Sequence, residues 1–146
     1  MSAASKFFSE EQKVQVVNAV KQAELNTSGE IRVHLEDSCK EDVLDHAAFI
    51  FDKLEMHNTE LRNGVLFYLA AKDHKFAILG DAGINEKVPN NFWEDIKELM
   101  AGEFKQGQFA EGLSKGIIMA GEQLKAHFPY QKDDKNELSD EISFGG

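Results

Sequence analysis

The sequence contains few of the residues that stabilise secreted domains or anchor a protein in a membrane. Its 146 residues include two prolines and one cysteine, which cannot form an internal disulfide. No apolar run approaches the ~20 residues that a transmembrane helix needs. Residues 1–6 also lack the apolar segment of a secretory leader. These absences exclude a disulfide-stabilised fold and a membrane span, and they predict a cytoplasmic protein.

Positive charge is scarce as well. Lysine and arginine number 16 against 26 aspartates and glutamates, which gives a formal net charge of -10. Such a charge repels nucleic-acid phosphates and anionic lipid surfaces. We therefore expect no nucleic-acid partner, and we expect metal ions or a basic protein partner instead. The composition, 42% hydrophobic and 29% charged, is that of a single globular domain with an ordinary core.

Helical periodicity is the first positive signal in the sequence. Residues 9–12, Ser-Glu-Glu-Gln, have the pattern of a capping box, and Val14, Val17 and Val20 follow at helical spacing. This pattern predicts a first helix that ends at the turn residues 26–29. Further helices are predicted over residues 42–56, 91–100 and 109–127.

The last predicted helix contains several glycines, with Gly112 and Gly116 at helical spacing and Gly121 after them. Because glycine costs a helix roughly 1 kcal/mol relative to alanine, we expect the helix backbone to approach another element closely. The sheet is the expected neighbour. A phosphate-binding glycine loop is the other interpretation, but these glycines lie within helical periodicity and not between a strand and a helix.

Three segments have the character of strands. EIRVHLE, residues 30–36, alternates apolar and polar side chains, as a half-buried strand does. Residues 65–71 are almost continuously apolar, and residues 76–80 return after a short polar turn. A right-handed crossover makes the first two strands parallel, and the hairpin adds an antiparallel neighbour. We predict one α/β/α domain over residues 1–130, with helices on both faces of a small mixed sheet, and an acidic tail over residues 131–146.

The direction of these strands predicts a cluster of polar side chains at one edge of the sheet. The two parallel strands start at this edge and the second strand of the hairpin ends there, which gathers Glu30, Asn63 and Asp81. Carboxylate and amide oxygens are hard ligands for divalent cations. The sequence therefore predicts a metal site formed by these three residues, with Ca²⁺ favoured over Mg²⁺.

Two alternatives to this site stay open. Glu30 and Asp81 also suit solvated strand ends that pair with nearby basic residues, namely Arg32, Arg62 or Lys87. In addition, open α/β sheets usually bind ligands beyond the carboxyl ends of their parallel strands. That opposite edge is acidic too, and it contains Glu36, Asp37, Ser38, Lys72 and Asp73.

The sequence contains no evident catalytic nucleophile, and catalytic residues stay unassigned. Cys39 stands among acidic residues, which disfavour a thiolate. No G-x-S-x-G pattern marks a serine nucleophile. Because the predicted carboxylates repel a phosphate group, any phosphatase activity would depend on a bound cation. The acidic tail, including Asp140 and Glu141, is a second candidate for loose Ca²⁺ binding or for docking on a basic partner.

Several ordered blocks along the chain resemble the TPM-domain family. They are SGEIRVHLE, RNGVLFYLAAKDHKFAILGDAGIN and FKQGQFAEGLSKGI, followed by HFPY and the acidic tail. The resemblance covers roughly residues 9–130 and implies a compact α/β/α domain. It also implies divalent-metal binding in an acidic cleft, and some members are described as acid phosphatases. Positions that match recurrent family residues are Gly29, Glu30, Asn63, Gly64, Gly80, Gly83, Phe109 and Gly112.

The sequence departs from the family at two points. Many relatives are exported or carry a transmembrane segment after a glycine-rich tail, and this sequence shows neither feature. The family residue at the position of Asp81 varies, whereas those at Glu30 and Asn63 recur. We expect a metal-stabilised binding domain, and a metal-dependent phosphatase acting on phosphate monoesters is the alternative.

Overall fold

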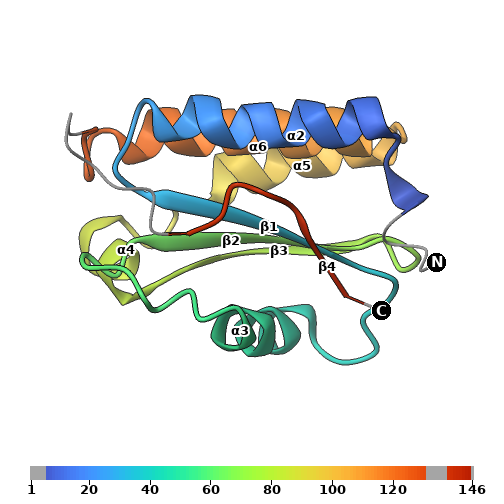
Figure 1. Cartoon of the computed structure of the whole chain (residues 1–146), viewed down its shortest axis with the longest axis horizontal. Coiled ribbons are helices and arrows are strands. Elements are labelled where there is room, and N and C mark those ends of the chain that lie inside the picture. The colour runs from blue at the N-terminus through green and yellow to red at the C-terminus, as the bar shows by residue number, and fades with distance from the viewer. Residues whose placement is uncertain (1–5, 131–137, 146) are drawn as a thin grey trace.

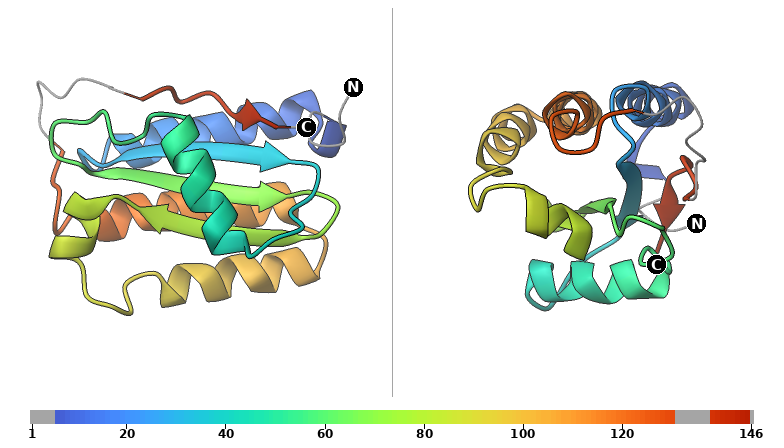
Figure 2. Two further views of the ribbon diagram at one scale, coloured as in Figure 1. Left: turned by 90° about the horizontal axis from the view of Figure 1, so that it is seen from below. Right: turned by 90° about the vertical axis from the view of Figure 1, so that its left-hand side faces the viewer.

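The computed structural model describes residues 6–130 and 138–145 of the chain. A four-stranded sheet separates two helical layers (Figures 1 and 2), which confirms the predicted α/β fold with helices on both faces. One face is covered by α2 (Glu10–Glu24), α5 (Glu94–Lys105) and α6 (Phe109–Leu124). The other face is covered by α3 (Val43–Lys53), and the short α4 (Ala82–Lys87) lies at one end of the sheet. Among the described residues, the helices are too short or too polar to cross a bilayer.

The sheet has the strand order β3-β2-β1-β4. Its strands are β1 (Glu30–Glu36), β2 (Gly64–Ala70), β3 (Lys75–Gly80) and β4 (Ser143–Phe144). The central strands β1 and β2 are parallel, with Glu30 opposite Gly64. Strand β3 is antiparallel to β2, with Val65 opposite Gly80. The predicted crossover and hairpin are therefore both present, and β2 is buried along its whole length, as its apolar run indicated.

Alternation along the strands divides the core into two layers. Ile31, Val33 and Leu35 of β1 join the larger cluster, which they share with α2, α5 and α6. On the opposite face, Leu66 of β2 packs with Ile50 of α3 in a second cluster. The polar residues of β1 consequently alternate away from the larger core.

Two short elements were not predicted. The six-residue α4 follows Asp81 directly, and it has no repeated apolar stripe that would signal a helix. The two-residue β4 pairs in parallel with β1, with Ser143 opposite His34. Two residues are too few for an alternating pattern, so only the chain's contact with β1 reveals this strand. By contrast, α2 begins with the predicted capping box between Ser9 and Gln12.

The glycines of α6 approach other helices and not the sheet, which corrects the expected neighbour. A Cβ atom built on Gly121 would lie 2.7 Å from the Cα of Ala23 in α2. One built on Gly116 would lie 2.6 Å from the Sδ of Met100 in α5. The spacing of the glycines shows that one face of the helix lacks side chains and can be approached closely. It does not show which element lies against that face.

We expect Gly121→Ala to lower the free energy of unfolding by about 1–3 kcal/mol, because the new methyl group meets the backbone of α2. Gly102→Ala is the matched control within a helix, since a Cβ atom there meets no described atom within 4 Å. The control should raise stability by about 0.5–1 kcal/mol through helix propensity. Urea denaturation of both variants measures the difference, and equal effects would contradict the close approach.

Candidate functional site

The structure places Glu30, Asn63 and Asp81 at the edge where β1 and β2 begin and β3 ends. The Glu30 N–H donates to Asn63 O at 3.1 Å, and the Asp81 N–H donates to Gly64 O at 2.9 Å. Glu30 and Asp81 flank β2, so two strand spacings, or ~10 Å, separate their backbones. All three side chains are buried. Each has polar partners of its own, and these partners differ.

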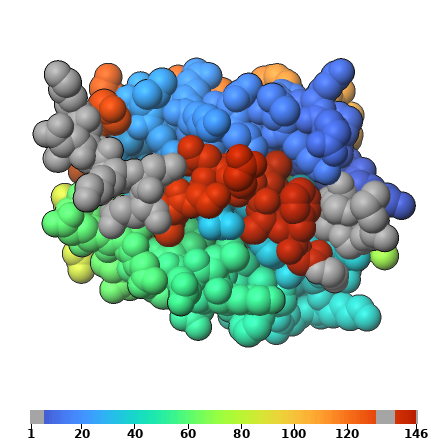
Figure 3. Space-filling model, in the orientation of Figure 1, coloured from blue at the N-terminus to red at the C-terminus, as the bar shows by residue number. Residues whose placement is uncertain are grey.

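Glu30 anchors the C-terminal segment of the chain. It is 4% exposed, and its Oε1 accepts a hydrogen bond from the Leu138 N–H at 2.8 Å. Leu138 begins the C-terminal segment, residues 138–145, which crosses the surface between α2 and α3 (Figure 3). Residues 131–137 of the predicted tail lie outside the described part of the chain. The described part of the tail is therefore held on the sheet in part by a buried carboxylate.

Asn63 connects the turns that precede β1 and β2. Its side-chain Nδ2 donates to Ser28 O at 3.0 Å, and its backbone N–H donates to Thr59 Oγ1 at 3.2 Å. The side chain is also buried, with an exposed fraction of 2% for the residue. These bonds fix the relative position of the two strand starts, and so they position Glu30.

Asp81 is held by basic residues. Arg62 donates from Nε to Oδ2 at 2.8 Å and from Nη2 to Oδ1 at 2.9 Å, while His57 Nδ1 lies 3.2 Å from Oδ1. Asp81 also caps α4 by accepting from the Ala82 N–H at 2.7 Å. Burial raises the pKa of Asp81, but these hydrogen bonds outweigh burial, and the pKa lies below its usual range. The alternative of pairing with Arg62 is thus observed.

The glycines around Asp81 bring its loop against the Arg62 turn. A Cβ atom built on Gly83 would lie 2.1 Å from Leu61 O, a distance that no side chain can tolerate. The Gly83 N–H donates to Arg62 O at 2.8 Å, and Arg62 itself has a φ of 51°. Glycine at this position therefore permits the backbone contact that sets the Arg62 guanidinium over the Asp81 carboxylate.

Glu24 and Asp140 add two carboxylates beside Glu30, and the sequence did not single out Glu24. Glu24 Oε2 accepts from the Ile31 N–H at 3.2 Å, and its carboxyl group is hydrogen-bonded to that of Asp140. Burial, then Asp140, and to a smaller extent the charge of Glu30 raise the pKa of Glu24 to about 9. Burial and the neighbouring carboxylates therefore favour the protonated form of Glu24. Helical periodicity gave no signal for Glu24, because its partners come from distant segments.

The described residues do not form a complete metal centre by themselves. Among them, no group of three or more His, Cys, Asp or Glu side chains is arranged to hold a metal ion. A Ca²⁺ ion takes six to eight oxygen ligands, including backbone carbonyls and water. The half-buried carboxylates of Glu24 and Asp140 could supply only part of such a shell with Glu30, and the rest would have to come from carbonyl groups and water.

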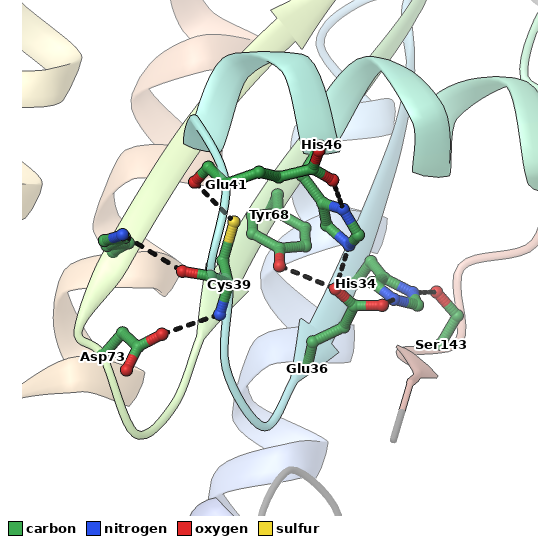
Figure 4. Close-up of polar contacts among 9 residues, drawn as sticks. His34, Glu36, Cys39, Glu41, His46, Tyr68, Asp73 and Ser143 are labelled. Atoms are coloured by element: carbon green, nitrogen blue, oxygen red, sulfur yellow. Dashed lines mark hydrogen bonds and ion pairs between the residues drawn. The ribbon is translucent and has the colours of Figure 1, made fainter.

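The opposite edge of the sheet contains a hydrogen-bonded network around Glu36 (Figure 4). Glu36 Oε1 accepts from the Tyr68 hydroxyl at 2.7 Å and lies 2.6 Å from His46 Nε2. Glu36 Oε2 lies 3.2 Å from His34 Nε2, although the imidazole is not aligned for a hydrogen bond. His34 Nδ1 lies 2.6 Å from Ser143 Oγ, which ties β4 to β1.

The charges of this network compensate one another. Burial raises the pKa of Glu36, but its contacts with Tyr68, His34 and His46 outweigh burial and hold the pKa low. Burial lowers the pKa of His34. Burial also opposes the charged form of His46, but contacts with Glu41 and Glu36 raise its pKa above the usual value. The carboxylate at this edge is thus paired with neighbouring described side chains.

Cys39 lies beside this network but is inaccessible. Its thiol is buried, and Sγ donates to Glu41 O at 3.3 Å. The Cys39 N–H donates to Asp73 Oδ2 at 2.7 Å, and Lys75 Nζ donates to Cys39 O at 3.0 Å (Figure 4). These contacts give Cys39 a structural role, that of holding the loop after β1 against the β2–β3 turn.

We expect Asp81→Ala to lower the free energy of unfolding by at least ~1 kcal/mol, because it removes the cap of α4 and the partner of Arg62. Asp95→Ala, at an exposed position in the first turn of α5, is the matched control. Guanidinium denaturation compares the two variants. Loss of stability in both to the same extent would show that the contacts of Asp81 contribute nothing specific.

Comparison with known proteins agrees with the fold. The TPM domain family model matches residues 2–123. The BA42 protein from the psychrophilic bacterium Bizionia argentinensis, solved by NMR, is 47% identical with a TM-score of 0.91, and the match covers 95% of this chain and 96% of that one. Two N-terminal domains share the fold. One, from P. gingivalis, is 20% identical with a TM-score of 0.68, and the match covers 84% of this chain and 79% of that one. The other, from the cg2496 protein of Corynebacterium glutamicum, is 11% identical with a TM-score of 0.61, and the match covers 92% of this chain and 79% of that one. No protein of curated function matches. The chain belongs to the TPM domain family.

Proposed function

We propose that this TPM domain binds one divalent cation, Ca²⁺ in preference to Mg²⁺, beside Glu30 and acts as a metal-stabilised binding domain. The observation that supports the proposal is that Glu24 is hydrogen-bonded to Asp140 and is also affected by the charge of the buried Glu30. Carboxylates in such a setting repel one another unless a proton or a cation lies between them. A divalent cation would take the place of the proton that the raised pKa of Glu24 favours.

The chemistry of the site favours calcium. Ca²⁺ accepts irregular shells of carboxylates, carbonyl groups and water, whereas Mg²⁺ demands a nearly ideal octahedron. Glu30 and Asn63 belong to the predicted set, and we add Glu24 and Asp140 to it. Asp81 would join the shell only on leaving Arg62, since both of its oxygens now accept hydrogen bonds from that guanidinium.

A binding role is better supported than a phosphatase role. Transfer of a phosphoryl group requires positive charge on its oxygens as well as a nucleophile or an activated water. Arg62, the basic residue predicted beside the site, is engaged by Asp81, and the Cys39 thiol is buried. Glu30 instead bonds the C-terminal segment, and a cation shared with the Asp140 carboxylate would hold that segment more firmly on the sheet.

The binding proposal predicts a titration with a defined location. Adding Ca²⁺ should shift the amide NMR signals of residues around Glu24, Glu30 and Asp140 and should raise the melting temperature. Glu30→Gln should abolish both effects because it removes a carboxylate while keeping the size of the side chain. Glu122→Gln, at an exposed position on α6, is the control and should leave both effects unchanged.

Shifts confined to the Glu36 edge, or spread over the whole acidic surface, would contradict the proposed location. Hydrolysis of p-nitrophenyl phosphate by the purified protein tests the phosphatase alternative. Turnover that requires a divalent cation and disappears in Glu30→Gln would support it. Turnover that persists with excess chelator would show that a metal at this site is not involved.

The raised pKa of Glu24 predicts an unusual pH dependence in the metal-free protein. The folded state holds a proton up to about pH 9 that the unfolded state releases near pH 4.5. Stability from this group is therefore full below pH 4.5 and is lost as pH rises toward 9, by up to ~1 kcal/mol per pH unit after discounting for solvent. Denaturation in chelator at several pH values measures the slope. Glu24→Gln should flatten it, Glu122→Gln should not, and an unchanged slope in Glu24→Gln would contradict the assignment.

A further inference from the structure

A cavity of about 280 Å³ opens at the end of the sheet opposite Glu30. It lies between the β2–β3 turn, the end of α5 and the start of α6, which meet at one end of the molecule (Figure 2). We call it the aromatic pocket, and its lining residues are His74, Phe76, Ala101, Phe104, Lys105 and Phe109. Its volume is close to the lower end of the range of small-molecule sites.

Three phenylalanine rings form the walls of the aromatic pocket. Phe104 lies 5.1 Å from Phe76 in an edge-on arrangement of 89° and 5.1 Å from Phe109 in a stacked arrangement of 25°. All three rings are partly exposed. A Cβ atom on Gly112 would lie 2.9 Å from Phe104 Cε1, so this glycine allows the ring to sit against α6. Phe109 is also contacted by His74 at 4.8 Å and by Phe7 at 5.1 Å, so the rings pack against one another and remain only partly exposed toward the cavity.

The charge around the aromatic pocket is opposite to that of the protein as a whole. Among the described residues that line it, none is acidic, and Lys105 and His74 are exposed there. Asp73, the acidic residue of the β2–β3 turn, accepts a hydrogen bond from the Cys39 N–H (Figure 4). The pocket also lies at the start of α6, whose cap residue Gln108 makes no side-chain hydrogen bond to the helix. The positive end of the helix dipole adds to the charge of Lys105, although Glu111 in the first turn of α6 offsets part of it.

We propose that the aromatic pocket binds a small planar aromatic molecule that bears one carboxylate. The ring would lie against the phenylalanine walls, where an aromatic face gains both apolar contact and favourable ring geometry. The carboxylate would lie toward Lys105 and His74, in a protein whose net charge of -10 otherwise repels anions. This site is distinct from the cation site, which lies at the opposite end of the sheet.

The test uses 2-naphthoate as the probe, with 2-naphthamide as its neutral analogue. Titration into the ¹⁵N-labelled chain, followed by amide NMR, should shift the signals of residues 74–76 and 101–109. The amide should bind more weakly than the carboxylate. Running the titration in chelator separates this result from the cation proposal, because a failure of either one leaves the other unaffected.

Two variants sharpen the test. Ala101→Phe fills the cavity without removing a wall ring and should abolish binding of 2-naphthoate. Lys105→Glu should weaken binding by about two- to fivefold, as expected for an exposed ion pair. Lys125→Glu, at an exposed position beyond the far end of α6, changes the net charge equally and should have no effect. Shifts elsewhere, equal binding of the amide, or unchanged binding in both Ala101→Phe and Lys105→Glu would overturn the proposal.

Discussion

The parallel pairing of β1 with β2 is the constraint on which the rest of this structure depends. It sets Glu30 opposite Gly64 at one end and Glu36 opposite Ala70 at the other. The bonds of Asn63 to Ser28 and Thr59 secure the first of these ends. Because both strands run the same way, each end of the sheet collects polar side chains from segments that are distant in the sequence. The two ends then acquire different electrostatics.

The difference between the ends is the basis of the proposal that a cation binds at one of them. At the Glu36 end, histidines and a tyrosine surround a single carboxylate, and its charge is compensated within the protein. At the Glu30 end, Glu24 is hydrogen-bonded to Asp140, and burial together with the neighbouring carboxylates raises the pKa of Glu24. Asp81 is the exception at that end, because Arg62 neutralises it. The C-terminal segment touches both ends, through Leu138 at one and Ser143 at the other. Binding at Glu30 would therefore affect how that segment is held.

Sequence patterns predicted the main elements well, because the amphipathic elements each have one buried face and β2, which is buried throughout, is continuously apolar. EIRVHLE marked β1, the apolar run marked β2, and the capping box at Ser9 marked α2. The short elements α4 and β4 were not predicted, because elements of six and two residues are too short to show a periodic pattern of apolar residues. The prediction that the α6 glycines pack against the sheet was wrong for a related reason. The sequence shows that one face of the helix has glycines in place of side chains. Tertiary packing determines which element lies against that face.

The sequence by itself determined the α/β class, the direction of the strands and the edge that gathers Glu30, Asn63 and Asp81. These follow from local patterns and from the handedness of crossover connections, which hold for any chain. Only the tertiary structure decided what each side chain meets there: Arg62 for Asp81, Leu138 for Glu30, and Asp140 for Glu24. The physical reason is that hydrogen bonds and charges act over a few ångströms. A strand order places residues at the same edge, but side-chain packing decides which of them come within that range.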